Sequence, residues 1–481
     1  MPQIDRTRFV RDIFNAKKDK ATLLHLLKAS NDFESIFSTL RESIKHPVVK
    51  SWVYANPFPK EYSELRSTKI VSNSGNVVGE IIWNLLPVIN EYEKINLFLN
   101  KKRTYETLVL AGKYNEARLQ LEDIENTFGK SIWLIENRLV VSELIGGTEG
   151  DWETLSEFAK ELSEPLISYF TENLSKRVEE KITYTRYRDI LFNQLSELSV
   201  GDEFREYLLY RLDYVSVKEF VNFDYFLSTE STSSLIDRYL LLRETLVDVC
   251  STLPAAIVKK ILRKAKDIDD TVLVQISNQV DASEFVEFDR TSELLELFDI
   301  YTTGDYDSCI KSITRLLKQT PYVVELFDLY AKCNLEISET YVSANISPLI
   351  DRILGDIFKL YKKGSDSTSA MEDLLKMSTV YFSFDFAKQL VALVSSLTNA
   401  DLGNKAYDRF YLLFSAINNP KSLRDFESNF HNGNLQKLLI KYPGSLCLNV
   451  LHSIASGLGE GIEGKKIPNS KKAIYLLKSY Y

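Results

Sequence analysis

The 481-residue chain has few of the residues that break helices. Its 18 glycines and 12 prolines make up about 6% of the sequence, where average usage is about 12%. A chain with so few breakers forms few tight turns, which argues against β-sandwiches and β-barrels. The shortage favours long helices joined by short connections.

Cysteine and histidine are also scarce, and no C-x-x-C pair occurs. The four residues of each type are Cys250, Cys309, Cys333, Cys447, His25, His46, His431 and His452. This supply suits a reducing compartment and leaves little material for a zinc site. We predict no metal and no cofactor.

Long uncharged runs are missing as well. The N-terminal residues lack the apolar core of a signal peptide, and no stretch approaches the roughly 20 apolar residues of a membrane span. The formal net charge of −8 argues against a general polyanion-binding role. These absences predict a cytoplasmic protein that does not enter a membrane.

Helical periodicity is what the sequence has in abundance. One apolar stripe consists of Leu235, Tyr239, Leu242, Leu246 and Val249, and two others run through 349–361 and 387–397. Charged residues of the first segment, such as Arg238 and Arg243, are expected to point away from that stripe. The patterns predict an all-α fold, and irregular stretches at 47–76, 146–150, 364–369 and 457–469 suggest segments 1–76, 77–363 and 370–481.

Two short runs of the sequence resemble each other. Gly112-Lys113-Tyr114-Asn115-Glu116-Ala117 corresponds to Gly304-Asp305-Tyr306-Asp307-Ser308-Cys309. In each run, glycine would end one helix, the tyrosine would fill the turn, and the small Ala117 or Cys309 would let two helices approach closely. Pro321 would then close the second helix. Weaker copies begin at Gly150-Asp151-Trp152 and Gly433-Asn434-Leu435.

These positions resemble the tetratricopeptide-like (TPR-like) superfamily of helical repeats. The first-helix signature of that family is missing, since Tyr105 and Leu297 stand where its glycine would be. The segment 451–481 is similar to a Sel1-type repeat. The resemblance implies an α-solenoid that binds another protein through a concave surface, as a non-enzymatic scaffold or regulatory subunit. Multi-component complexes, including those of bacterial antiviral defence, are one setting that it suggests.

Several short motifs match those of known binding or catalytic sites but lack the surrounding sequence that such sites need. Gly459, Gly461 and Gly464 match a dinucleotide fingerprint, yet too few residues follow for a nucleotide-binding fold. Cys447 and His452 would lie on different sides of a helix. His25 is better explained as a histidine at the edge of the core, and His46-Pro47 as a helix stop. Glu179-Glu180-Lys181 is better explained as part of a charged helix, and Asp267 with Asp269 and Asp270 as a solvated helix boundary.

One basic segment, residues 258–266, remains as a candidate partner-binding site. Val258, Ile261, Leu262 and Ala265 would form an apolar stripe, and the cations include Lys259, Lys260, Arg263 and Lys264. Such a helix can bind phosphates or an acidic partner. A nucleic-acid-binding accessory subunit is therefore the alternative to the scaffold, while an ordinary solvated face is the structural explanation. The aromatic cluster at 220–226 is read as packing between helices, or else as an exposed anchor patch.

Overall fold

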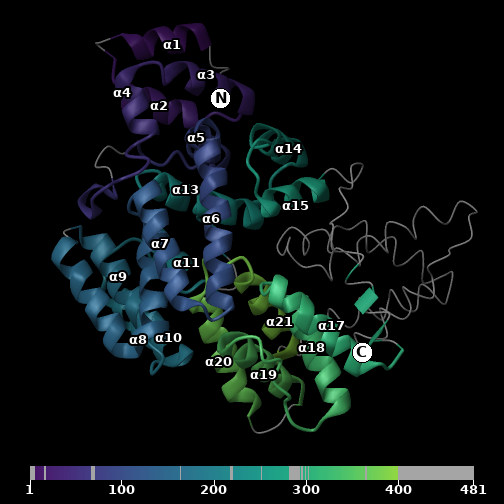
Figure 1. Cartoon of the computed structure of the whole chain (residues 1–481). Coiled ribbons are helices and arrows are strands. Elements are labelled where there is room, and N and C mark those ends of the chain that lie inside the picture. Colours follow the sequence, from purple (N-terminus) through teal and green to yellow (C-terminus); the bar gives the residue numbers. More distant parts are fainter. Residues whose placement is uncertain are drawn as a thin grey trace, which may run out of the picture. The chain divides into compact units, whose positions relative to one another are not determined.

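The chain folds into helices throughout the part that the structure describes. The computed structural model describes residues 6–15, 18–66, 71–162, 164–216, 220–250, 252–280, 293, 296–297, 300–301, 303–362 and 366–398. Every regular element in those ranges is helical, which confirms the predicted all-α class (Figure 1). The turn expected at Gly433 and the Sel1-like segment 451–481 lie outside the described residues.

The chain divides into two compact units. Unit 1 comprises Met1–Glu106 and Tyr114–Val280, and unit 2 comprises Thr107–Lys113 and Asp281–Tyr481. The divisions suggested by the loops at 47–76 and 364–369 do not coincide with this one, because helices on both sides of each loop pack together.

Short helices, one helix with a fully buried centre and one longer helix open unit 1. They are α1 (Arg6–Phe14), α2 (Lys20–Lys28), α3 (Phe33–Ser43), α4 (Pro47–Val53), η1 (Tyr62–Glu64), α5 (Val77–Asn90) and α6 (Tyr92–Leu110), whose last turn belongs to unit 2. Every residue of α5 from Gly79 to Val88 is buried. A helix that is buried on all sides forms the centre of a core, and α2, α3, α4, α12 and α13 pack around it.

The rest of unit 1 contains α7 (Tyr114–Phe128), α8 (Ile132–Glu161), α9 (Pro165–Val178), α10 (Tyr184–Glu197), α11 (Asp202–Leu212), η2 (Tyr214–Ser216), α12 (Phe223–Glu230), α13 (Leu235–Val249), α14 (Ala255–Lys264) and α15 (Thr271–Val280). Polar side chains that accept a backbone N–H define several helix starts. Such caps are Asp32, Asn76, Ser131, Thr183 and Ser234.

Unit 2 is a stack of consecutive helices. They are α17 (Tyr306–Gln319), α18 (Val324–Ile337), α19 (Pro348–Lys362), α20 (Ser367–Val380) and α21 (Ala387–Thr398). Each helix packs against the next one along the chain, the order expected of an α-solenoid. The apolar stripe predicted in 349–361 is buried from Leu349 to Phe358.

Two sequence predictions about polar segments were wrong. The stretch 47–76 is not irregular throughout, because α4 and η1 lie within it. Arg238 and Arg243 do not point away from the core but are buried on α13. Arg238 donates from Nη1 to the Val53 carbonyl oxygen at 2.8 Å and from Nε to Asn84 Oδ1 at 3.1 Å. A buried guanidinium needs such partners, and apolar periodicity does not reveal them.

The aromatic cluster near residue 220 lies inside the helix packing. Phe220 and Phe226 are buried, and their rings surround Tyr210 with centroid distances of 4.9 and 5.1 Å. Phe223 meets the same tyrosine edge-on at 6.0 Å. The reading of this cluster as inter-helix packing is therefore confirmed.

Candidate interaction surfaces

The turn at Gly112 has the geometry of a helix C-cap. Gly112 has φ 75°, a left-handed conformation that glycine adopts without strain. The Lys113 N–H donates to the Leu108 carbonyl oxygen at 2.9 Å, and the Gly112 N–H donates to that of Val109 at 3.0 Å. These two bonds form a Schellman motif. Gly304 has a similar φ of 82° immediately before α17.

The other signature positions belong to the packed interior or to the edges of these turns. Ala117 and Cys309 are fully buried, and Cys309 donates from Sγ to the Leu297 carbonyl oxygen. Tyr114 and Tyr306 are half-buried, while Pro321 is buried directly after α17. All of these side chains contribute to packing. Only the half-exposed tyrosines among them could also contact a partner.

Helix α14 carries the predicted basic segment, and its apolar stripe is buried. Val258, Ile261, Leu262 and Ala265 all lie in the core. Arg263 and Lys266 are exposed, and Lys259 and Lys260 are half-buried. The apolar side of α14 is already covered, so the surface that a partner would meet is cationic.

Lys264 is held within the chain. Its Nζ lies 3.4 Å from Glu34 Oε2 and 4.6 Å from the centre of the Phe37 ring, both on α3. The ion pair and the cation–π contact dock α14 on α3. Of the four candidate partner-binding residues, Lys264 is therefore already engaged.

The carboxylates after α14 do not all lie on a solvated boundary. Asp267 and Asp269 are exposed, but Asp270 is buried. Asp270 accepts a hydrogen bond from the Tyr239 hydroxyl and lies 3.5 Å from Arg243 Nη1. The boundary reading is thus wrong for Asp270, whose carboxylate neutralises a buried guanidinium.

Helix α8 is folded back on itself. Gly147, with φ 60° and ψ −153°, interrupts its helical backbone. On either side of this residue, the Ser142 and Thr154 hydroxyls lie 2.7 Å apart, and the Arg138 guanidinium lies 5.6 Å from the Phe158 ring centre. Each pair has one partner on either side of Gly147. We name residues 132–146 the outgoing limb and residues 148–161 the returning limb.

This hairpin corrects the predicted repeat copy at Gly150-Asp151-Trp152. The chain turns at Gly147, three residues before the expected glycine. Trp152 does not fill the turn, because 63% of its surface is exposed. Phe158 on the same limb is buried instead and contacts Tyr62 edge-on, with ring centres 5.5 Å apart.

Acidic side chains accompany Trp152 on the returning limb. Glu149, Glu153, Glu157 and Glu161 are exposed at four-residue intervals, so they follow one side of the helix. Trp152 neighbours Glu149 at the i, i+3 spacing. Lys160 is an exposed cation on the same side. We call these four glutamates the acidic face; Trp152 lies beside its Glu149 end, whereas Glu157 and Glu161 lie on other sides of the helix from Trp152.

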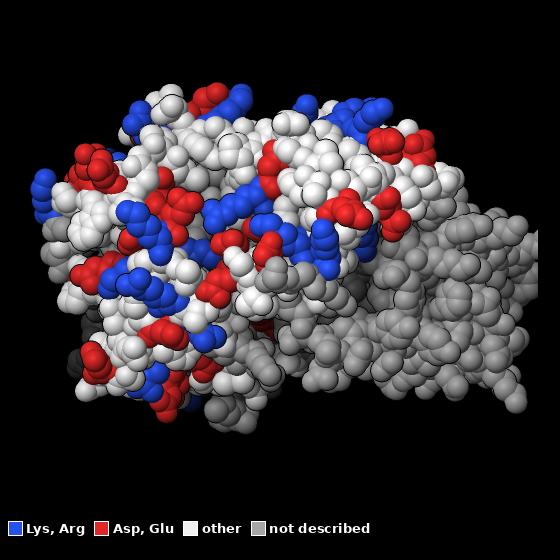
Figure 2. Space-filling view, turned by 90° about the horizontal axis from the view of Figure 1, so that it is seen from below, with Lys and Arg blue, Asp and Glu red and all other residues white. Residues whose placement is uncertain are grey.

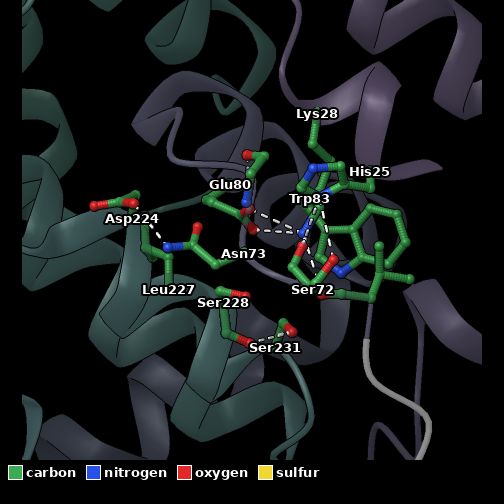
Figure 3. Close-up of polar contacts among 12 residues, drawn as sticks. His25, Lys28, Ser72, Asn73, Glu80, Trp83, Asp224, Leu227, Ser228 and Ser231 are labelled. Atoms are coloured by element: carbon green, nitrogen blue, oxygen red, sulfur yellow. Dashed lines mark hydrogen bonds and ion pairs between the residues drawn. The ribbon is translucent and has the colours of Figure 1, made fainter. Parts of the chain in front are cut away.

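A buried ion pair joins α2 to α5, as Figure 3 shows. Lys28 Nζ lies 2.9 Å and 3.0 Å from the two carboxylate oxygens of Glu80. Ser74 donates to Glu80 from its backbone N–H and its hydroxyl, at 3.0 and 2.9 Å. The Lys28 ammonium also lies 5.2 Å from the Trp83 ring centre.

A buried lysine can serve as a catalytic base or nucleophile when its pKa is low. Burial does lower the pKa of Lys28, although the Glu80 carboxylate opposes that shift. Its side chain is only 1% exposed, however, and both Glu80 oxygens hold it. No substrate can reach the nitrogen in this arrangement. The pair therefore links two helices and does not form a reactive site.

The remaining sequence candidates have structural roles where they are described. His25 is half-buried and its Nδ1 lies 3.2 Å from the Ser72 hydroxyl (Figure 3). His46 does not merely stop a helix, because its Nδ1 accepts from the Val48 N–H and caps α4. The Glu179–Lys181 triplet forms the turn after α9 and not a charged helix. Cys447, His452 and the glycine cluster 459–464 lie outside the described residues.

The described residues were also compared with the requirements of a metal site and of a membrane span. Within them, no three or more His, Cys, Asp or Glu side chains are grouped to hold a metal ion. No helix there is both long and apolar enough to cross a bilayer. Figure 2 shows basic and acidic side chains interspersed over the described part of the face seen from below.

Comparison with known proteins gives no match: no family model, no curated protein and no solved structure is similar to the chain at a significant level. We therefore infer function from the surface of the chain itself. The sequence pattern does not point to the acidic face, because Trp152 corresponds to the turn-filling Tyr114 and Tyr306 in the predicted repeat copy. The four-residue spacing of the glutamates was the signal that could have revealed it.

Proposed function

We propose that the protein is a non-enzymatic scaffold or regulatory subunit that binds another protein through the acidic face and the adjoining Trp152. One observation carries the proposal: Trp152 is 63% exposed on a regular helix. Tryptophan contributes large contact area with few rotatable bonds and is enriched among the residues that dominate binding energy. Its exposure is unusual for a residue type that is mostly buried.

The surroundings of Trp152 indicate the chemistry of the partner. Glu149 and Glu153 are the glutamates nearest to Trp152 along the helix, and they give its surroundings a negative charge. Electrostatic complementarity favours a segment rich in Lys or Arg, and a cation placed over the indole ring would add a cation–π contact. The expected ligand is a basic protein segment that places a cation or an apolar side chain on Trp152.

The helix hairpins support this role by holding the face in place. The Phe158 ring and the Thr154 hydroxyl fix the returning limb against the outgoing limb. A rigid surface loses little conformational entropy on binding. We propose that the hairpins at Gly112 and Gly304 are of the TPR-like type, whose members act mostly in recognition.

Affinity capture with matched variants tests the proposal. The full chain, Trp152→Ala and Leu119→Ala would be immobilised and exposed to the same native-host extract. Leu119 is a suitable control because it is 59% exposed on a different helix, α7. We expect a protein that is enriched by the wild type and by Leu119→Ala but lost with Trp152→Ala. Equal capture by all three would refute a role for Trp152 and the adjoining acidic face.

Helix α14 supports a second candidate, a nucleic-acid-binding accessory subunit. Its exposed surface carries Arg263 and Lys266, with Lys259 and Lys260 half-exposed beside them. Binding of labelled DNA and RNA would be measured by anisotropy at several salt concentrations, because phosphate contacts weaken steeply as salt rises. Reversal of Lys259, Lys260, Arg263 and Lys266, which leaves the contacts of Lys264 with α3 in place, should abolish binding. No binding by the wild type at low salt removes this candidate.

A further inference from the structure

Two exposed helix surfaces of unit 1 carry opposite charge. The acidic face on the returning limb of α8 presents Glu149, Glu153 and Glu157. Helix α14 presents Lys260 and Arg263, with Lys266 just beyond its end. Four-residue steps correspond to about 6 Å along a helix. The three glutamates therefore span about 12 Å, and Lys260, Arg263 and Lys266, at three-residue steps, span about 9 Å, so the two rows of charge have comparable lengths.

The two surfaces do not pair within one molecule. Figure 1 shows α8 at the lower left and α14 at the upper right of unit 1. Their contacts differ accordingly. The returning limb is anchored through Phe158 to Tyr62 and Arg138, whereas α14 is docked on α3 through Lys264. Each charged surface is left facing outward from its anchor.

We propose that the acidic face of one copy binds helix α14 of a second copy. This inference rests on the proposed role of the acidic face in protein binding and names its occupant. The apolar stripe of α14 is buried, so its outward surface offers cations and the aliphatic stems of lysine. Such stems pack on an aromatic ring while the ammonium remains near carboxylates. Trp152 beside Glu149 provides that combination.

The fixed arrangement of both helices strengthens the pairing. Neither surface needs to fold or move before contact, because each is held on its buried side. An interaction carried by exposed charges must weaken as salt rises, since the Debye length falls from about 10 Å at 0.1 M to about 3 Å at 1 M. The reciprocal contact would close a symmetric dimer, and a single contact per copy would form a head-to-tail chain.

Sedimentation of the full chain tests this inference directly. The average molecular mass of the wild type should rise with protein concentration at about 0.1 M salt, and this rise should disappear at about 1 M salt. Two triple reversals are informative: Glu149→Lys with Glu153→Lys and Glu157→Lys, and Lys260→Glu with Arg263→Glu and Lys266→Glu. Each variant alone should remain monomeric, because its two surfaces then repel. An equimolar mixture of the two should associate again.

A matched control keeps the result specific. Lysine replacements at Glu122, Asp189 and Asp202 change the formal charge by the same amount and sign as the reversal of Glu149, Glu153 and Glu157, on exposed side chains of α7, α10 and α11. These replacements should leave self-association unchanged. Circular dichroism would confirm that each variant is folded. Restored association in the mixture also shows that both variants are folded.

Several results would overturn the inference. A wild type that stays monomeric at every concentration would do so, yet it would leave the capture of another protein through Trp152 untouched. A mixture that fails to associate would contradict the pairing of these two surfaces. Loss of wild-type association after nuclease treatment would show that nucleic acid bridges the copies, and direct pairing would then be wrong.

Discussion

The hydroxyl groups of Ser142 and Thr154 lie 2.7 Å apart although both residues belong to α8. This contact requires the helix to reverse between them. The single non-helical residue, Gly147, provides the reversal. The returning limb, its outward Trp152 and its row of glutamates all depend on this turn.

Gly147→Ala should destabilise the hairpin of α8. The φ of 60° and ψ of −153° at Gly147 lie in a region that is almost restricted to glycine, and other residues there cost about 1–3 kcal/mol. Urea unfolding should show a loss of that size. Gly146→Ala is the matched control, because Gly146 has no positive φ and an added Cβ would meet nothing within 4 Å. Equal losses from both variants would argue against a special turn at Gly147.

Two tryptophans in α8 should respond in opposite ways to truncation. Trp133 is 2% exposed and meets Phe98 edge-on at 5.1 Å, so Trp133→Ala should cost about 3–5 kcal/mol of unfolding free energy. Trp152→Ala removes an exposed side chain and should change stability by about 0.5 kcal/mol or less. Chemical unfolding of both variants measures the contrast. A large loss from Trp152→Ala would place that ring in the core.

The sequence was sufficient to predict the helices and one type of turn. Apolar stripes such as the one from Leu349 to Phe358 are visible because burial of one helix face has a 3.6-residue period. The turns at Gly112 and Gly304 can be predicted because the two runs that contain them resemble each other. The glycine of the α8 turn was placed three residues too late, since Gly146, Gly147 and Gly150 are all available in the same stretch.

Apolar periodicity cannot predict which polar residues are buried in the core. Arg238 lies among leucines on α13, and its position predicts a solvent-facing side chain. Its hydrogen-bond partners come from α4 and α5, more than 150 residues earlier in the chain. Such long-range pairing leaves no local pattern. The acidic face escapes prediction for a different reason. An aromatic residue close to a glycine resembles the tyrosines that fill the turns at Gly112 and Gly304, so the pattern predicts a packed side chain at Trp152.

The buried pair Lys28–Glu80 should show strong coupling. Lys28→Met would leave the Glu80 carboxylate buried without its cation, which typically costs about 3–5 kcal/mol. Glu80→Gln would strand the ammonium in the same way. The double variant should therefore be less destabilised than the two losses combined, by about 0.5–3 kcal/mol. Strict additivity in urea unfolding would show that the two groups do not interact.

Asp237 on α13 links that helix to the start of α8. Its Oδ2 and Oδ1 accept from the backbone N–H groups of Ile132 and Trp133, both at 2.9 Å. Burial, followed by the nearby negative charge of Glu230, raises the pKa of Asp237 from 3.8 to about 6, although Arg211 opposes the shift. The folded protein therefore holds a proton on Asp237 at a pH where the unfolded chain has released it.

This difference predicts the sign of a pH effect on stability. Between pH 3.8 and about 6 the native state binds more protons at Asp237 than the unfolded state, so its contribution to the free energy of unfolding falls as pH rises. The slope reaches at most about 1.4 kcal/mol per pH unit. Asp237→Asn removes the titrating group, and urea unfolding from pH 4 to 7 should show that the wild type loses stability relative to this variant as pH increases. Parallel pH profiles for the two proteins would mean that Asp237 titrates alike in the folded and unfolded states. Comparison of slopes separates this effect from the constant loss that the substitution causes at the start of α8.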